Sequence, residues 1–115
     1  GQSLRTIRIV WFGAEEIGLF GGLDYLRRHG AQPHHAIAES DFGADRIWRV
    51  TSKLGPERIA EARALAAALA PLGILTGAFD RAEGSDIGPM IAAGVPAVGL
   101  SQGGARCQPD QRADQ

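Results

Sequence analysis

Two adjacent carboxylates, Glu15 and Glu16, are the residues whose type and spacing point most directly to chemistry. Neighbouring positions at the start of a helix point about 100° apart, so the two side chains cannot do the same job at one point. One carboxylate could hold a cation while the other reaches a water molecule bound to it. The alternative is that the pair only complements the helix dipole, because negative charge is favoured at a helix amino terminus.

The elements that flank the two glutamates would hold them at the edge of a sheet. Before them, Arg5 to Phe12 contains a near-continuous apolar run, which is typical of a strand covered on both faces in a mostly parallel sheet. Gly13 and Ala14 then allow a sharp turn into the first turn of a helix. We therefore expect both carboxylates just beyond the carboxyl end of a central strand, where open α/β sheets bind ligands.

A second polar strand end is expected at Ala36 to Asp41, a short strand that finishes in Glu39, Ser40 and Asp41. These groups would reach the same sheet edge as the glutamates. Taken alone, Asp41 is best interpreted as a turn residue, since Asp followed by Phe-Gly suits a loop. The adjacent His34 and His35 precede this strand at the opposite end, so we interpret them as part of a surface loop and not as metal ligands.

The remaining pattern alternates helices and strands without an internal repeat, a linker or a second domain. The expected elements are a helix that buries Leu19, Phe20, Leu23 and Leu26 and ends at Gly30, an edge strand from Ile47 to Thr51, an alanine-rich helix from Pro56 to Leu69, a short helix capped by Ser85 or Asp86 and ended by Gly94, and a buried strand from Ala97 to Leu100. Capping sufficiently explains Ser85 and Asp86, so neither is assigned to catalysis.

Three stretches carry a resemblance to a known family: Trp11 to Gly22, Ala38 to Asp45 and Gly84 to Leu100. They resemble segments of the zinc-dependent aminopeptidases and carboxypeptidases of the peptidase M28 family. The resemblance implies a three-layer α/β/α sandwich with a mostly parallel central sheet, and a complete site that holds two zinc ions. By position it implies that Glu15 is the general base, that Glu16 binds one zinc and that Asp41 binds the other.

The sequence departs from the family pattern at both ends. The family's first His ligand and bridging Asp would come before Gly1, and Ala105 to Gln115 contains no histidine where a His ligand is expected. Of the usual five metal-binding positions, Glu16 and Asp41 remain. We therefore expect residues 1–101 to form a partial M28-like catalytic domain, with a polar, disordered tail at 102–115.

The resulting functional prediction is a fragment of a zinc-dependent exopeptidase that hydrolyses peptide bonds and is inactive in isolation, so whether this chain is itself an enzyme stays open. One alternative is a non-catalytic, peptidase-like module that only binds partners. Another is an unrelated α/β domain whose adjacent glutamates are ordinary for a helix start. The residues do not distinguish an aminopeptidase from a carboxypeptidase.

Composition narrows the range of partners. The 115 residues include 12 Lys and Arg against 13 Asp and Glu, for a formal charge of −1, so nothing indicates binding to nucleic acid or to an acidic membrane surface. No apolar run approaches the ~20 residues of a membrane span. The single cysteine, Cys107, cannot form an internal disulfide. A peptide substrate, and a secreted or periplasmic location, are implied by the family resemblance alone.

Overall fold

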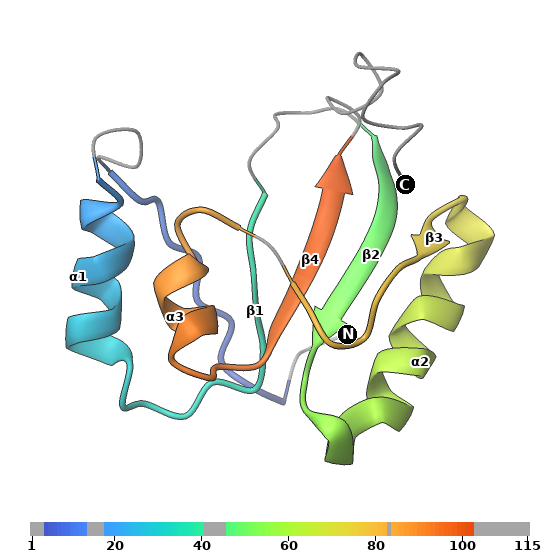
Figure 1. The fold of residues 1–115 in the computed structure, drawn as a ribbon, viewed down its shortest axis with the longest axis horizontal. Coiled ribbons are helices and arrows are strands. Elements are labelled where there is room, and N and C mark those ends of the chain that lie inside the picture. Colours follow the sequence, from blue (N-terminus) through green and yellow to red (C-terminus); the bar gives the residue numbers. More distant parts are fainter. Residues whose placement is uncertain (1–3, 14–17, 41–45, 83, 103–115) are drawn as a thin grey trace.

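The computed structural model describes residues 4–13, 18–40, 46–82 and 84–102 (Figure 1). Its sheet has four strands in the order β1-β4-β2-β3. The bounds are Ile37–Ala38 for β1, Ile47–Lys53 for β2, Leu75–Thr76 for β3 and Ala97–Gln102 for β4. The pairs β1–β4 and β2–β3 are parallel and the pair β2–β4 is antiparallel. The predicted mixed α/β fold with a mostly parallel sheet is confirmed.

The helices form two groups, one on the side of each edge strand. Figure 1 shows α1 (Phe20–His29) and α3 (Gly88–Ala92) on the β1 side, and α2 (Ile59–Leu69) on the β3 side. Two short 3-10 turns, Pro56–Arg58 and Ala70–Leu72, flank α2. Helices α1 and α3 pack against each other, and α2 packs against β2 and β3. Within the described ranges, no helix is long and apolar enough to cross a membrane.

The core lies between α2 and the sheet. Val50, Ala66 and Ile74 form its buried centre, and partly buried residues of α2 and β4 pack around them. Ala97 begins β4 and is 0% exposed. Because side chains alternate along a strand, Ala97 points to the face opposite the next residue, Val98, which packs on this core. Both faces of β4 are therefore covered.

The helix predicted for Pro56 to Leu69 is confirmed, and its causes are local. Pro56 occupies the first turn of the preceding 3-10 helix, where its missing N–H costs nothing. Alanine, the best helix former, dominates the interior of α2, and Ala62 and Ala66 are buried on one side. Small side chains on that side let the helix approach β2 and β3 closely.

The central strand predicted from Arg5 to Phe12 is wrong for this structure. The segment is extended but belongs to no strand, and Ile7, Ile9 and Trp11 are 75%, 73% and 90% exposed. A strand is defined by backbone hydrogen bonds to a neighbour. Among the residues that the structure describes, no backbone hydrogen bond joins positions 6–12 to β1. The apolar pattern is present without the pairing that would bury it.

Two further expectations need correction. The strand from Ile47 is not an edge, because β2 lies between β4 and the two-residue strand β3, which the sequence did not predict. The apolar stripe predicted for α1 is partly exposed, since Phe20 is 58% and Leu23 is 48% exposed. Only Gly22 of α1 is fully buried. The end of α1 is as predicted, with Gly30 as the capping residue.

Candidate functional site

The three residues predicted to carry chemistry, Glu15, Glu16 and Asp41, lie outside the described residues. The nearest described residues are Gly13 and Gly18 on either side of the glutamates and Ser40 before Asp41, and they indicate the region in which the predicted site would lie. Gly13 precedes the two glutamates, and Ser40 precedes Asp41 at the carboxyl end of β1. The geometry around these flanks can therefore be compared with the predicted convergence at one sheet edge.

Glu39 connects the end of β1 to the turn before α3. Its Oε1 accepts hydrogen bonds from the backbone N–H groups of Asp86, at 2.8 Å, and Ile87, at 3.1 Å. Its Oε2 accepts from the backbone N–H of Ser85, at 3.2 Å, and from the Ser85 hydroxyl, at 3.3 Å. One carboxylate thus satisfies consecutive N–H groups that the short helix cannot pair internally. Bonds to a charged acceptor are stronger than neutral ones.

This arrangement corrects the predicted capping of α3. Neither Ser85 nor Asp86 caps the helix with its side chain, and α3 begins after Ile87 without a side-chain cap. The acceptor comes instead from Glu39, which is 46 to 48 residues away in the sequence. The Glu39 carboxylate therefore accepts the hydrogen bonds that the sequence predicted for a side-chain cap at Ser85 or Asp86.

Two glycines at the start of α1 allow close backbone contacts, Gly22 with the turn before α3 and Gly21 with Gly13. A β-carbon on Gly22 would collide with the backbone oxygen of Asp86, so α1 touches the turn that Glu39 holds. The Gly21 N–H donates to the Gly13 oxygen at 3.1 Å, and a β-carbon on Gly21 would lie 2.6 Å from that oxygen. A continuous series of contacts thus runs from Gly13 through α1 and Asp86 to Glu39.

A second set of bonds fixes Ser40 against the end of β4. Its hydroxyl donates to Oε1 of Gln102 at 3.2 Å, and Gln102 is only 7% exposed. The indole N–H of Trp48 donates to the backbone oxygen of Gln102, also at 3.2 Å. The carboxyl ends of β1 and β4 and the beginning of β2 are therefore tied together beside the position of Asp41.

The backbone just before α1 adopts an uncommon conformation. Gly18 has φ 136°, and Leu19, the N-cap residue, has φ 60° and ψ 31° in the left-handed region. A branched side chain at positive φ is a strained arrangement that tends to persist where the surroundings impose it, as at functional sites. Because α1 begins at Phe20, no acidic residue lies in its first turn. Glu15 and Glu16 therefore do not belong to the first turn of α1, and their own conformation lies outside the described residues.

No metal site is formed by the described part of the chain alone. Those residues contain no group of three or more His, Cys, Asp or Glu side chains that could hold an ion. His29 ends α1, and His34 and His35 lie in the connection that enters β1 at the end opposite Glu39. His34 and His35 thus lie in a connection between elements, where the sequence predicted a surface loop. The predicted zinc ligands Glu16 and Asp41, whose carboxylate oxygens are of a kind that zinc accepts, lie outside the described residues.

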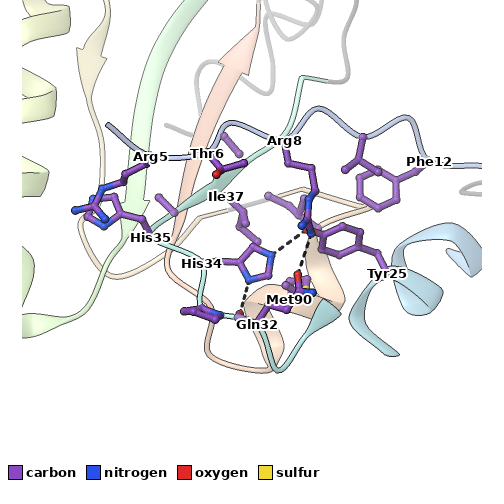
Figure 2. Close-up of a pocket in the computed structure, with 15 residues that line it drawn as sticks. Arg5, Thr6, Arg8, Phe12, Tyr25, Gln32, His34, His35, Ile37 and Met90 are labelled. Carbon is purple, nitrogen blue, oxygen red and sulfur yellow. Dashed lines mark hydrogen bonds between the residues drawn. The ribbon is translucent and has the colours of Figure 1, made fainter. Parts of the chain in front are cut away.

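A separate cavity of about 640 Å³ lies between the extended segment 5–12, α1 and the amino end of β1 (Figure 2). The Nδ1 of His34 lies 2.8 Å from the carbonyl oxygen of Gln32, which can only accept, so Nδ1 carries a proton. In the neutral imidazole, Nε2 then accepts from the Tyr25 hydroxyl at 2.9 Å. Arg8 donates to that hydroxyl at 3.2 Å and to Oε1 of Gln32 at 3.1 Å.

These cavity side chains bind mainly to one another. The ring of Phe12 also meets Tyr25 edge to face, at 5.9 Å between centroids. The cluster therefore anchors the extended segment to α1 and to the connection before β1. Its polar groups have partners within the cluster, and Gln32 and His34 precede β1, although the cavity continues along Ala38 to Ile87. We interpret it as a structural contact and not as the catalytic site.

Sequence reasoning did not recognise the roles of Glu39 and Gln102. Glu39 was noted only as one of the polar groups at a strand end, and Gln102 was assigned to the polar tail. A signal was present for Glu39, because a carboxylate two residues before a predicted ligand is placed to organise its surroundings. No comparable signal marks Gln102, whose burial depends on β4 continuing past Leu100.

The chain was compared with protein-family models and with curated proteins. No protein-family model matches the chain. Over 98 residues it is 33% identical to carboxypeptidase Q of Xenopus laevis and 34% identical to that of Rattus norvegicus, which is 84% of this chain and 21% of each relative. The chain thus spans about a fifth of the length of the curated relatives it matches.

A solved structure gives the same result for the fold. The crystal structure of a peptidase M28 precursor from Shewanella amazonensis SB2B superposes with a TM-score of 0.73 at 33% sequence identity. The match covers 82% of this chain and 22% of that protein. The resemblance inferred from Trp11 to Gly22, Ala38 to Asp45 and Gly84 to Leu100 is therefore confirmed in both sequence and fold.

Proposed function

We propose that this chain, which resembles part of an M28 peptidase, supplies one portion of the catalytic site of a zinc-dependent exopeptidase. The observation that carries the proposal is the series of contacts from Gly13 through Gly21, Gly22 and Asp86 to Glu39. It joins Gly13, two residues before Glu15, to Glu39, two residues before Asp41. The predicted general base and metal ligands would therefore lie near one another.

In the proposed site the residues have separate roles. Zinc would lower the pKa of a bound water and polarise the scissile carbonyl. Glu15 would take the proton from the water and pass it to the leaving amine, with Glu16 and Asp41 as ligands of different ions. Glu39 would touch neither substrate nor metal, because its oxygens are occupied by the turn at Ser85 to Ile87. It would act as a positioning residue for the strand end.

We further propose that the 115-residue chain is inactive by itself. A catalytic zinc usually has three protein ligands and a water. Glu16 and Asp41 would give each ion one terminal ligand, which cannot hold zinc in the fixed geometry that activates water. Glu15 would then be a base without an activated water, and its replacement by Gln should change nothing measurable in this chain.

The experiment is a dipeptide and aminopeptide hydrolysis assay with added zinc on two proteins. One is the 115-residue chain, and the other is the Shewanella M28 peptidase with its matched segment replaced by this chain. We expect activity from the chimera alone. In the chimera, Glu15→Gln should abolish turnover and leave zinc content unchanged, whereas Glu61→Gln, an exposed change on α2, should leave both unchanged.

Two outcomes would contradict parts of this proposal. Zinc-dependent activity of the 115-residue chain that is lost on Glu15→Gln would sink the idea that it is inactive in isolation. A folded chimera that binds no zinc and hydrolyses nothing would favour the alternative, a peptidase-like module that only binds partners.

A further inference from the structure

The cavity between segment 5–12, α1 and β1 carries positive charge that is only partly balanced. The described residues that line it include Arg5 and Arg8 and no Asp or Glu. Arg5 has a carboxylate nearby, because the pKa of Glu61 is lowered by the hydrogen bond from Arg58 and also by the charges of His35 and Arg5. The charge of Arg8 is therefore the one to be accounted for.

The hydrogen-bond partners of Arg8 are neutral. Its Nη1 donates to the Tyr25 hydroxyl and to Oε1 of Gln32, and Arg8 forms no ion pair with a described residue. A guanidinium has five N–H groups, and these two bonds use the pair on Nη1, so the groups on Nε and Nη2 are left. Together they form an edge that a carboxylate accepts with both of its oxygens.

The neutral partners also hold the guanidinium in place. Figure 2 shows the Arg8 side chain running from the extended segment towards Tyr25, Gln32 and His34. The Tyr25 hydroxyl is itself held by Nε2 of His34, at 2.9 Å. A guanidinium that is fixed before an anion arrives loses less conformational entropy when it binds one.

Much of the remaining cavity wall is apolar, and it includes Val10, Phe12, Ile37, Ile87 and Met90. Ile87 and Met90 are only 5% and 2% exposed, so they form a closed apolar surface within the cavity. The volume of about 640 Å³ lies within the ~300–1,000 Å³ of small-molecule sites, which combine apolar walls with a few polar groups.

We propose that this cavity binds a small carboxylate with an apolar body. The carboxylate lies on the Nε–Nη2 edge of Arg8, and the apolar body lies against Ile37, Ile87 and Met90. A monoanion balances the charge of Arg8, whereas inorganic phosphate adds a second charge and has no apolar part. This site is separate from the proposed peptidase function, because it uses neither the predicted general base nor the predicted metal ligands.

The test is a titration of the 115-residue chain with hexanoate, followed by two-dimensional amide NMR. We expect saturable binding with a Kd on the order of 1 mM, which suits a ligand of this size, and chemical-shift changes centred on Ile37 and Met90. Acetate should bind at least about tenfold more weakly, because each buried methylene strengthens binding about fourfold. Inorganic phosphate should also bind more weakly than hexanoate.

Three variants locate the binding site. Arg8→Gln should weaken hexanoate binding about tenfold or more, because it removes the charge and the two parallel N–H groups. Val10→Asp places a negative charge in the cavity, at a position that is 38% exposed, and should weaken binding to a similar extent. The matched control is Arg63→Gln, an exposed change on α2 that should leave the affinity unchanged. Far-UV circular dichroism checks that each variant is folded.

Each outcome decides the proposal. A wild-type chain without saturable shifts at about 20 mM hexanoate, well above the expected Kd, overturns it. An unchanged affinity in either cavity variant overturns it as well, so Val10→Asp is sufficient if Arg8→Gln is unfolded. Equal weakening by Arg63→Gln, or equal affinities for hexanoate and acetate, would show a non-specific charge effect and no built site. Shifts centred on Phe79 would place the ligand in a different cavity and overturn the assignment.

Discussion

Replacing Glu39 by alanine should destabilise the fold far more than the loss of an ordinary surface charge. The change removes four hydrogen bonds, three of them from consecutive backbone N–H groups at Ser85 to Ile87. Ile87 is 5% exposed, so its N–H cannot easily recover a bond with water, whereas Ser85 and Asp86 are only partly buried. Leaving one buried donor unsatisfied and weakening two others should cost about 2–4 kcal/mol.

Glu39→Gln provides a graded comparison. Its amide oxygen can still accept from Asp86 and Ile87, while the amide NH₂ faces the Ser85 N–H, so the expected loss is about 1 kcal/mol. Glu57→Ala is the matched control, because Glu57 is an exposed glutamate in the 3-10 turn before α2, and its loss should stay within about 0.5 kcal/mol.

The assay is urea unfolding followed by far-UV circular dichroism, with the unfolding free energy of each variant extrapolated to water. The expected order of stability is wild type and Glu57→Ala together, then Glu39→Gln, then Glu39→Ala. If Glu39→Ala matched Glu57→Ala, the carboxylate would not be holding the turn. The inferred connection between β1 and α3 would then be wrong.

Two other changes test the packing and the charges. Gly22→Ala should lower the free energy of unfolding by about 1–3 kcal/mol, because the added methyl would collide with the Asp86 oxygen. The control is Gly88→Ala, whose methyl would have nothing within 4 Å and should be neutral or slightly stabilising. Equal urea midpoints for the two variants would contradict the close contact at Gly22. The hydrogen bond from Arg58 lowers the pKa of Glu61 below its ordinary 4.5, so the pair's stabilisation is present above that pH and lost as the pH falls through the lower folded value. Glu61→Gln should therefore lower the urea midpoint at neutral pH and converge with wild type in strong acid, and a deficit that persisted in acid would assign the effect to another interaction.

The sequence predicted best what depends on local interactions. Helix α2 follows from Pro56 and the alanine-rich run, and the end of α1 follows from Gly30, because helix hydrogen bonds join residues four apart. The ion pair between Asp24 and Arg28 on α1, at 2.8 Å, is of the same local kind.

Features set by distant partners were predicted less well. The run from Arg5 to Phe12 has the near-continuous apolar pattern of a buried strand, yet pairing needs a neighbour that composition cannot specify. The turn before α3 was assigned to Ser85 or Asp86, but its acceptor is Glu39 on another element. The placement of β2 inside the sheet depends on β3, which is too short to leave an apolar pattern.

For the candidate site, the sequence predicted the catalytic and metal-binding residues, and the structure describes residues near them in the chain. The family resemblance is confirmed by the matches to carboxypeptidase Q and to the Shewanella M28 peptidase. The roles of Glu15, Glu16 and Asp41 remain predictions, because these residues lie outside the described ranges. What the structure adds is the arrangement of their neighbours, Gly13 and Ser40, around the turn held by Glu39.

Chemical cross-linking tests the convergence of the predicted site most directly. In a chain with Cys107→Ser, the pair Glu16→Cys and Asp41→Cys would be treated with a bifunctional thiol reagent that spans about 8 Å, the reach of a two-metal site. The control pair is Glu16→Cys with Asp80→Cys, because Asp80 lies beside Lys53 at the opposite end of the sheet. We expect rapid intramolecular cross-linking of positions 16 and 41 and none between 16 and 80. Equal rates for the two pairs, or a faster reaction of the control pair, would contradict the proposed site.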